Sequence, residues 1–162
     1  MQIKSVETDK EVEELALVMW QTWQDTYKGI IDDNFWQSFT IKQCIKIAKK
    51  NKRQTLVAKI NQTVIGFIAF GPYRDSKEQL AGEIWALYVQ KKYHNQKIGQ
   101  LLMKEALKRL NGFPKVFVWV LKENERAIRF YKRAGFLENG ATKQIVLGDN
   151  CDEIQLEWRS IK

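Results

Sequence analysis

The sequence predicts a mixed α/β (α+β) fold in which a single, mostly antiparallel sheet is flanked by helices. Runs rich in β-branched and aromatic residues alternate with amphipathic segments, in the order β, α, α, β, β, β, α, β, α, β, β. The 162 residues, 44% of them hydrophobic, are enough for one core, and the chain shows no internal repeat or linker. We therefore expect one domain over residues 1–162.

The N-terminal third predicts a strand followed by two helices. Residues 2–7 have the pattern of a short strand. Thr8 and Glu11 form a capping-box pair at the start of a helix whose apolar residues recur at helical spacing as far as Trp23. A second amphipathic helix is expected to begin near Thr40.

The middle of the chain predicts three strands and a helix. Gln54–Ile60 and Thr63–Phe70 are rich in strand-forming residues, and Asn61-Gln62 between them predicts a tight hairpin. Gly82–Val89 also has a strand pattern. The apolar side of residues 97–110 predicts the next helix.

The C-terminal part predicts a strand, a helix and a closing pair of strands. The strand covers Lys115–Leu121. Asn124 suits the N-cap of the following helix, and Gly135 suits the left-handed residue that ends it. The last two strands are expected on either side of a turn at 147–150.

Composition narrows the classes of protein that fit. The net charge of +8 favours anionic partners, but the basic residues are dispersed, so most are expected on solvated helix faces. Because the sequence shows no nucleic-acid-binding motif, we expect no nucleic-acid partner, and a nucleic-acid binder stays the least favoured alternative. One histidine and two isolated cysteines, Cys44 and Cys151, predict free thiols and no metal site. Because no long apolar run indicates export or a membrane span, we expect a cytoplasmic protein without membrane partners.

The stretch from Leu87 to Gly99 predicts an anion-binding turn. A strand ends, the chain passes through polar residues, and a helix begins near Lys97. The first N–H groups of a helix have no partner within it and favour a phosphate or pyrophosphate. Lys91, Lys92 and Lys97 add positive charge there, although many units of this kind bind nothing.

This stretch and the later helix together resemble the acetyl-CoA signature of the GNAT superfamily of N-acetyltransferases. The later helix reads Asn-x-x-Ala-x-x-Phe-Tyr-x-x-x-Gly-Phe from Asn124 to Phe136, which matches the family pattern at every position. In the loop, where the family has Arg/Gln-x-x-Gly-x-Gly/Ala, His94 and Lys97 depart from the pattern and Gly99 fits it. The resemblance covers nearly the whole chain.

The resemblance implies an acyl-CoA N-acyltransferase-like fold, acetyl-CoA as the cofactor, and an enzyme that acetylates an amine. The backbone of the strand at 87–89 would hold the pantetheine arm and polarise the thioester carbonyl. The implied cofactor-binding residues are Leu87, Tyr88, Val89, His94, Asn95, Gln96, Lys97, Ile98, Gly99, Gln100, Asn124, Ala127 and Tyr131.

The resemblance also implies the catalytic pair. Tyr131 matches the family tyrosine that protonates the leaving thiolate, and Glu83 resembles a strand glutamate that some members use as a base through water. A carboxylate near its reference pKa of about 4.3 is a weak base, so burial or bridging water would have to assist Glu83. Because the two cysteines lie outside both motifs, direct transfer is expected.

The acceptor is expected to be a small-molecule amine such as a polyamine. Trp23-x-x-x-Tyr27-x-Gly29 resembles an element of several bacterial members, and the expected pocket residues are Trp23, Tyr27, Trp36 and Trp85. Asp25, Asp32 and Asp33 would attract a cationic amine. Acetylation of a peptide N-terminus and a non-catalytic, coenzyme A-binding sensor stay open as alternatives, as do a monomer and a homodimer.

Overall fold

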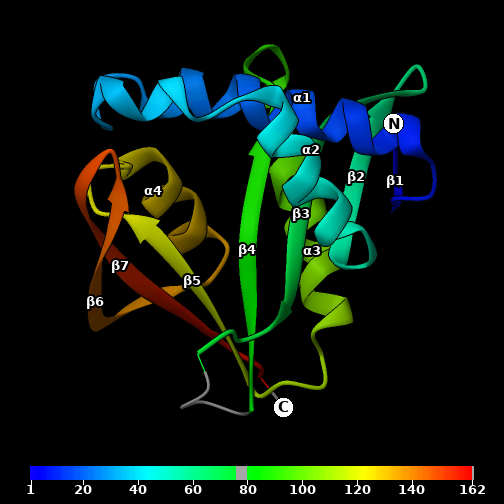
Figure 1. Cartoon of the computed structure of the whole chain (residues 1–162). Coiled ribbons are helices and arrows are strands. Elements are labelled where there is room, and N and C mark those ends of the chain that lie inside the picture. Colours follow the sequence, from blue (N-terminus) through cyan, green and yellow to red (C-terminus); the bar gives the residue numbers. More distant parts are fainter. Residues whose placement is uncertain (76–79, 162) are drawn as a thin grey trace.

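The computed structural model describes residues 1–75 and 80–161. Over these ranges the strands form a mixed seven-stranded sheet in the order β1-β2-β3-β4-β5-β7-β6 (Figure 1). The pair β4–β5 is parallel, and the other neighbours pair antiparallel. The strands are β1 (Gln2–Ser5), β2 (Thr55–Ile60), β3 (Thr63–Pro72), β4 (Ala81–Val89), β5 (Lys115–Leu121), β6 (Leu137–Leu147) and β7 (Asp149–Arg159). The predicted fold class is confirmed.

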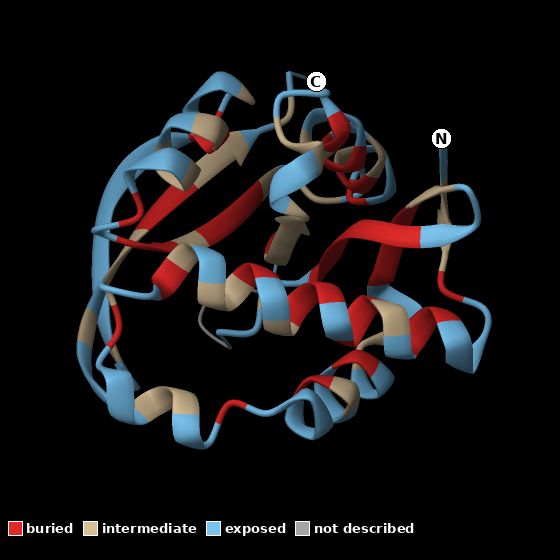
Figure 2. Cartoon of the chain, turned by 90° about the horizontal axis from the view of Figure 1, so that it is seen from above, coloured by how far each residue is buried: buried red, intermediate tan, exposed pale blue. Residues whose placement is uncertain are grey.

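Helices cover both faces of this sheet. One face carries α1 (Asp9–Tyr27) and α2 (Ile41–Lys50), and the other carries α3 (Ile98–Arg109) and α4 (Glu125–Arg133), as Figure 2 shows from above. Each face has its own buried apolar core. Short 3₁₀ turns η1 (Asp33–Gln37), η2 (Lys52–Gln54) and η3 (Lys91–Tyr93) join these elements.

The local signals in the sequence are confirmed where they rest on hydrogen-bonding chemistry. Thr8 and Glu11 form the predicted capping box, and the Asn124 side chain caps α4 by accepting from the N–H of Ala127. Gly135 has a φ of +99°, the left-handed conformation that ends a helix. None of the described helices is long and apolar enough to span a membrane.

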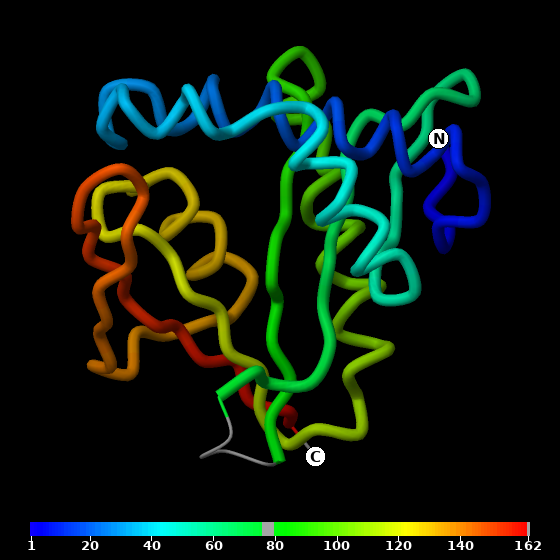
Figure 3. The backbone as a smooth tube through the Cα atoms, in the orientation of Figure 1, coloured from blue at the N-terminus to red at the C-terminus, as the bar shows by residue number. Residues whose placement is uncertain are grey.

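The sheet opens at its centre. The ladder between β4 and β5 covers Ala81–Ile84 against Lys115–Val118 and stops there, although the strands run on to Val89 and Leu121. β4 stays paired with β3, and β5 stays paired with β7, so the two halves separate (Figure 3). The backbone of residues 85–89 therefore has one edge without a neighbouring strand on the β5 side.

Candidate active site

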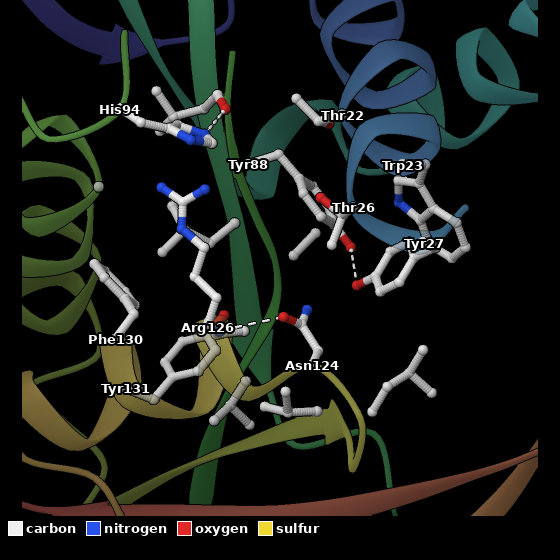
Figure 4. A pocket seen from close by; sticks show the side chains of 18 of the residues that line it. Thr22, Trp23, Thr26, Tyr27, Tyr88, His94, Asn124, Arg126, Phe130 and Tyr131 are labelled. Atoms are coloured by element: carbon white, nitrogen blue, oxygen red, sulfur yellow. Dashed lines mark hydrogen bonds between the residues drawn. The ribbon is translucent and has the colours of Figure 1, made fainter. Parts of the chain in front are cut away.

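A cavity of about 360 Å³ fills the gap between β4 and β5 (Figure 4). It extends from the N-terminus of α3, past the open edge of β4, to α1 and β7. Most of the predicted site residues line it: Trp23, Tyr27, Trp85, Leu87, Tyr88, Val89, His94, Asn95, Lys97, Ile98, Gly99, Gln100, Asn124, Ala127 and Tyr131. Segments far apart in the sequence thus meet around one space.

Three predicted residues do not line this cavity. Gln96 is exposed and donates to the carbonyl oxygen of Lys92. Trp36 packs edge-on against Phe35, with ring centroids 5.4 Å apart. The third is Glu83, which is described below.

The turn before α3 has the geometry of an anion site. Asn95 and Lys97 have φ values of 65° and 62°, in the left-handed region, and Lys97 occupies the N-cap without a side-chain hydrogen bond to the helix. The first N–H groups of α3 thus face the cavity without an internal partner or a cap. The glycine that the motif expects at 97 is explained by this backbone conformation, which costs an L-residue about 1–2 kcal/mol.

His94 fixes this turn to the end of β4. Its Nε2–H donates to the carbonyl oxygen of Val89 at 2.7 Å. Burial lowers the pKa of His94, and the nearby positive charge of Arg126 lowers it further. The imidazole is therefore neutral at physiological pH and serves as an anchor for the loop.

Gly99 lies in the first turn of α3, next to Phe130 of α4. A Cβ at this position would lie 3.2 Å from the ring of Phe130. A larger residue here would therefore require the ring of Phe130, which also lines the cavity, to shift by a few tenths of an ångström. Close packing of the two helices accounts for this glycine, whose φ is not in the positive region.

Among the described residues, the lysine and arginine side chains that line the cavity are Lys91, Lys97, Arg126 and Arg133. The sequence predicted most basic side chains on solvated helix faces and did not identify Arg126, which is exposed and whose guanidinium extends into the cavity between His94 and Tyr131 (Figure 4). Its position in the first turn of α4, one helical turn ahead of the Phe-Tyr pair, is the signal that could have identified it.

Tyr131 brings a buried phenol to the cavity. It is 7% exposed and packs edge-on between Phe130 and Phe136, with ring centroids 5.4 and 5.6 Å away. Burial raises the pKa of this phenol, and the charge interaction with Tyr27 raises it further. Tyr131 therefore carries its proton at neutral pH, as a proton donor must.

A pair of phenols lies on the opposite side of the gap from Tyr131. The hydroxyl groups of Tyr27, on α1, and Tyr88, on β4, are 3.2 Å apart and share a hydrogen bond (Figure 4). Burial raises the pKa of both phenols. This hydrogen bond joins α1 to the end of β4. Tyr27 lies in the wall of the cavity, where a pocket residue was predicted.

Glu83 is sequestered near the base of the gap. It is 2% exposed, and Arg74 donates to both carboxylate oxygens, at 2.9 Å from Nε and 3.1 Å from Nη2. The backbone N–H of Arg74 adds a third hydrogen bond at 3.2 Å. The catalytic role of Glu83 stays a prediction, and the carboxylate that the structure places in the cavity wall is Glu153.

A second, more apolar cavity of about 410 Å³ lies between α1, α2 and the sheet. It shares Trp23, Trp85, Ala86 and Tyr88 with the first, so the two adjoin. Among its described lining residues Arg74 carries the charge, while Phe35, Phe39 and Phe67 contribute aromatic rings. The predicted pocket residues Trp23 and Trp85 form the wall between the two spaces.

These features fit a long, phosphorylated cofactor. Uncapped helix N–H groups and basic side chains offer a site for phosphate oxygens, and the open edge of β4 offers backbone hydrogen bonds to an extended chain. The cavity continues from this edge to the phenol of Tyr131.

Comparison with known proteins gives the same assignment. The model of the acetyltransferase (GNAT) family matches residues 12–136. The uncharacterized N-acetyltransferase YuaI of Bacillus subtilis is 28% identical over 153 residues, covering 92% of this chain and 88% of YuaI. A spermidine N(1)-acetyltransferase of Thermoplasma acidophilum is 26% identical over 142 residues, covering 78% of this chain and 83% of that protein.

Solved structures share the fold. The PaiA N-acetyltransferase of Thermoplasma acidophilum, in complex with coenzyme A, superposes with a TM-score of 0.73 at 22% identity, over 99% of this chain and 100% of that one. The putative acetyltransferase yncA of Salmonella typhimurium, with its cofactor acetyl-CoA, gives 0.73 at 15% identity, over 98% and 93%.

Proposed function

The chain belongs to the acetyltransferase (GNAT) family, and we propose that it transfers the acetyl group of acetyl-coenzyme A directly to the primary amine of a small molecule such as a polyamine. It is an acyltransferase with acetyl-CoA as its cofactor. The observation that carries the proposal is the gap between β4 and β5, which joins the uncapped start of α3 to the buried phenol of Tyr131.

The cofactor's phosphates would bind at the N-terminus of α3, where the backbone N–H groups of residues 98–100 and the cations of Lys97 and Arg126 converge. The open edge of β4 at residues 87–89 would hold the pantetheine arm through backbone hydrogen bonds. When bound there, the cofactor supplies an activated acetyl thioester. Backbone N–H groups aimed at the thioester oxygen stabilise the negative charge that develops in acyl transfer.

Tyr131 is proposed as the general acid. Its proton neutralises the departing thiolate, and its burial among Phe130 and Phe136 keeps that proton on the phenol until it is needed. Neither cysteine lines the cavities, and burial raises the pKa of Cys44 to about 11. A thiolate nucleophile is therefore not available at the site, which supports direct transfer.

Two observations support a cationic amine as the acceptor. Asp25 of α1 and Glu153 of β7 both line the main cavity. The spermidine N(1)-acetyltransferase of Thermoplasma acidophilum is a relative over most of this chain. Polyamines carry several ammonium groups, which carboxylates attract.

The test is thiol release from acetyl-CoA in the presence of amines. Spermidine, spermine, putrescine, an aminoglycoside and short peptides would each be offered at several concentrations. The proposal expects turnover with polyamines above the rate of spontaneous hydrolysis. Faster turnover with peptides would favour an N-terminal acetyltransferase. Thermal stabilisation by coenzyme A without turnover of any amine would favour a sensor.

A further inference from the structure

We infer that Glu153 is the carboxylate that receives the acceptor's ammonium group and removes its proton, on the side of the gap opposite Tyr131. The inference rests on the proposed function and names a second catalytic residue. Glu153 lies on β7, outside the two motifs that locate the cofactor.

The register of the strands places Glu153 at the far end of the gap. Leu121, the last residue of β5, lies opposite Glu153 in the β5–β7 ladder, and Lys143 of β6 lies opposite it in the β6–β7 ladder. Directly paired residues in an antiparallel ladder project to the same face of the sheet. Leu121 packs with Tyr27 on the α1 face, so Glu153 faces α1 as well.

Tyr131 reaches the cavity from the other face. It belongs to the core under α3 and α4, together with Val118 and Val120 of β5. A thioester held between β4 and β5 would therefore have the phenol on one side and the Glu153 carboxylate on the other. An amine that enters from the α1 face meets the carboxylate before it meets the thioester.

Glu153 has capacity for a new partner. Its side chain is 13% exposed, and its ion pair with Lys143 is long, at 3.8 Å. The ammonium of Lys143 also lies over the ring of Trp119, 4.3 Å from the centroid. Glu83, by contrast, has both oxygens held by Arg74 and does not line the cavity. Asp25 lines the cavity but is exposed to solvent.

The surroundings make Glu153 a better base than a carboxylate in water. Burial raises its pKa, and this effect outweighs the lowering by nearby cations. A carboxylate whose pKa lies closer to neutrality removes a proton more readily. The groups that act on it electrostatically from neighbouring elements are Lys143 on β6, Arg74 after β3, Glu83 and Tyr88 on β4, and Tyr27 on α1.

The proton balance follows from this placement. A protonated amine gives one proton to a Glu153 oxygen, which later releases it to solvent. The freed lone pair on nitrogen forms the C–N bond at the acetyl carbon, the C–S bond breaks, and sulfur leaves with that electron pair. The thiolate takes the Tyr131 proton, and the second proton lost by nitrogen restores the phenol through the solvent. The products are an amide, a thiol and one proton.

The experiment compares Glu153→Gln with Glu157→Gln and Glu83→Gln over pH 6 to 10, using spermidine and acetyl-CoA. Glu157 is the matched control, because it lies four residues further along β7 on the same face and does not line the cavity. With the base present, kcat/KM should be flat at neutral pH. Without it, the rate should follow the free amine and rise about tenfold per pH unit.

We expect Glu153→Gln to lose about 100-fold in kcat/KM at pH 7 and much less near pH 10, with unchanged affinity for coenzyme A. Glu157→Gln should keep the flat profile. A flat profile in Glu153→Gln, or its loss in Glu83→Gln alone, overturns the inference while the proposed function stands. Absence of turnover in the wild-type protein instead counts against the proposed function.

A second readout does not depend on turnover. The Glu153 carboxyl carbon, assigned by its absence in Glu153→Gln, is followed by carbon-13 NMR in the wild-type protein with coenzyme A. Its titration midpoint should lie above that of an ordinary glutamate, and spermidine should lower it, because an ammonium favours the ionised form. An ordinary midpoint that spermidine leaves unchanged overturns the inference.

Discussion

The two sides of the gap between β4 and β5 are built in different ways. The side that faces α3 and α4 is made of two short sequence segments, and much of its chemistry is supplied by backbone: the uncapped N–H groups of α3 and the open edge of β4. The side that faces α1 is made of side chains from distant elements, such as Tyr27 of α1, Trp85 of β4 and Glu153 of β7. In the proposed function, the first side would bind the cofactor and the second would receive the acceptor.

The two carboxylates near the gap, Glu83 and Glu153, differ most in how their oxygens are paired. Arg74 encloses Glu83 under the gap with three hydrogen bonds, whereas Glu153 stands in the cavity wall with one long contact to Lys143. A carboxylate whose oxygens are already paired contributes to the fold. A partly desolvated carboxylate with a loose partner is available for chemistry.

The largest effect should come from the phenol on the α4 side. Tyr131→Phe should lower kcat by about 100-fold while it changes the dissociation constant of coenzyme A little, because the ring still packs and only the proton donor is lost. Steady-state kinetics and calorimetric binding measure the two quantities. Tyr73→Phe, at a phenol outside the cavities, is the control. Equal losses in kcat and in affinity would make Tyr131 a packing residue.

A smaller effect is expected at the phosphate end. Arg126→Ala should weaken coenzyme A binding about tenfold, since a charge-assisted contact to phosphate contributes on the order of 1.5 kcal/mol. Arg129→Ala is the matched control, because Arg129 lies on the same helix, is exposed and does not line the cavity. Titration of each variant at low and high salt measures the change. Similar affinities for both variants would remove Arg126 from the site.

The smallest effect is one of stability. Lys97→Gly should stabilise the protein by about 1 kcal/mol, because glycine adopts the left-handed conformation at φ 62° without strain. For a protein of this size the melting temperature should rise by about 2–4 °C. Lys104→Gly, in the middle of the same helix, should instead lower it. A lower melting temperature for Lys97→Gly would mean that the lysine side chain stabilises the turn.

The sequence allowed more to be predicted on one side of the gap than on the other. The capping box of Thr8 and Glu11, the hairpin at Asn61-Gln62 and the left-handed Gly135 depend on neighbouring residues, so local chemistry determined them. The side that faces α3 and α4 could be predicted for the same reason, because its strand, turn and helix are contiguous in the sequence.

The acceptor side depends on strand register, which a sequence pattern does not reveal. Glu153 reaches the cavity because β7 inserts between β5 and β6 and pairs Glu153 with Leu121. Trp36 belongs to an aromatic run that predicts pocket walls, but 3₁₀ geometry at η1 directs it against Phe35. Arg126 and Arg129 are both exposed arginines of α4, and the position of Arg126 in the first turn brings it into the cavity wall.

The central claim is that one channel runs from the N-terminus of α3 to the phenol of Tyr131. A crystal structure of the protein with coenzyme A tests it most directly. We expect the pyrophosphate on the N–H groups of residues 98–100 and the sulfur within hydrogen-bonding reach of the Tyr131 hydroxyl. A pyrophosphate bound elsewhere, or a sulfur remote from that hydroxyl, would contradict the account.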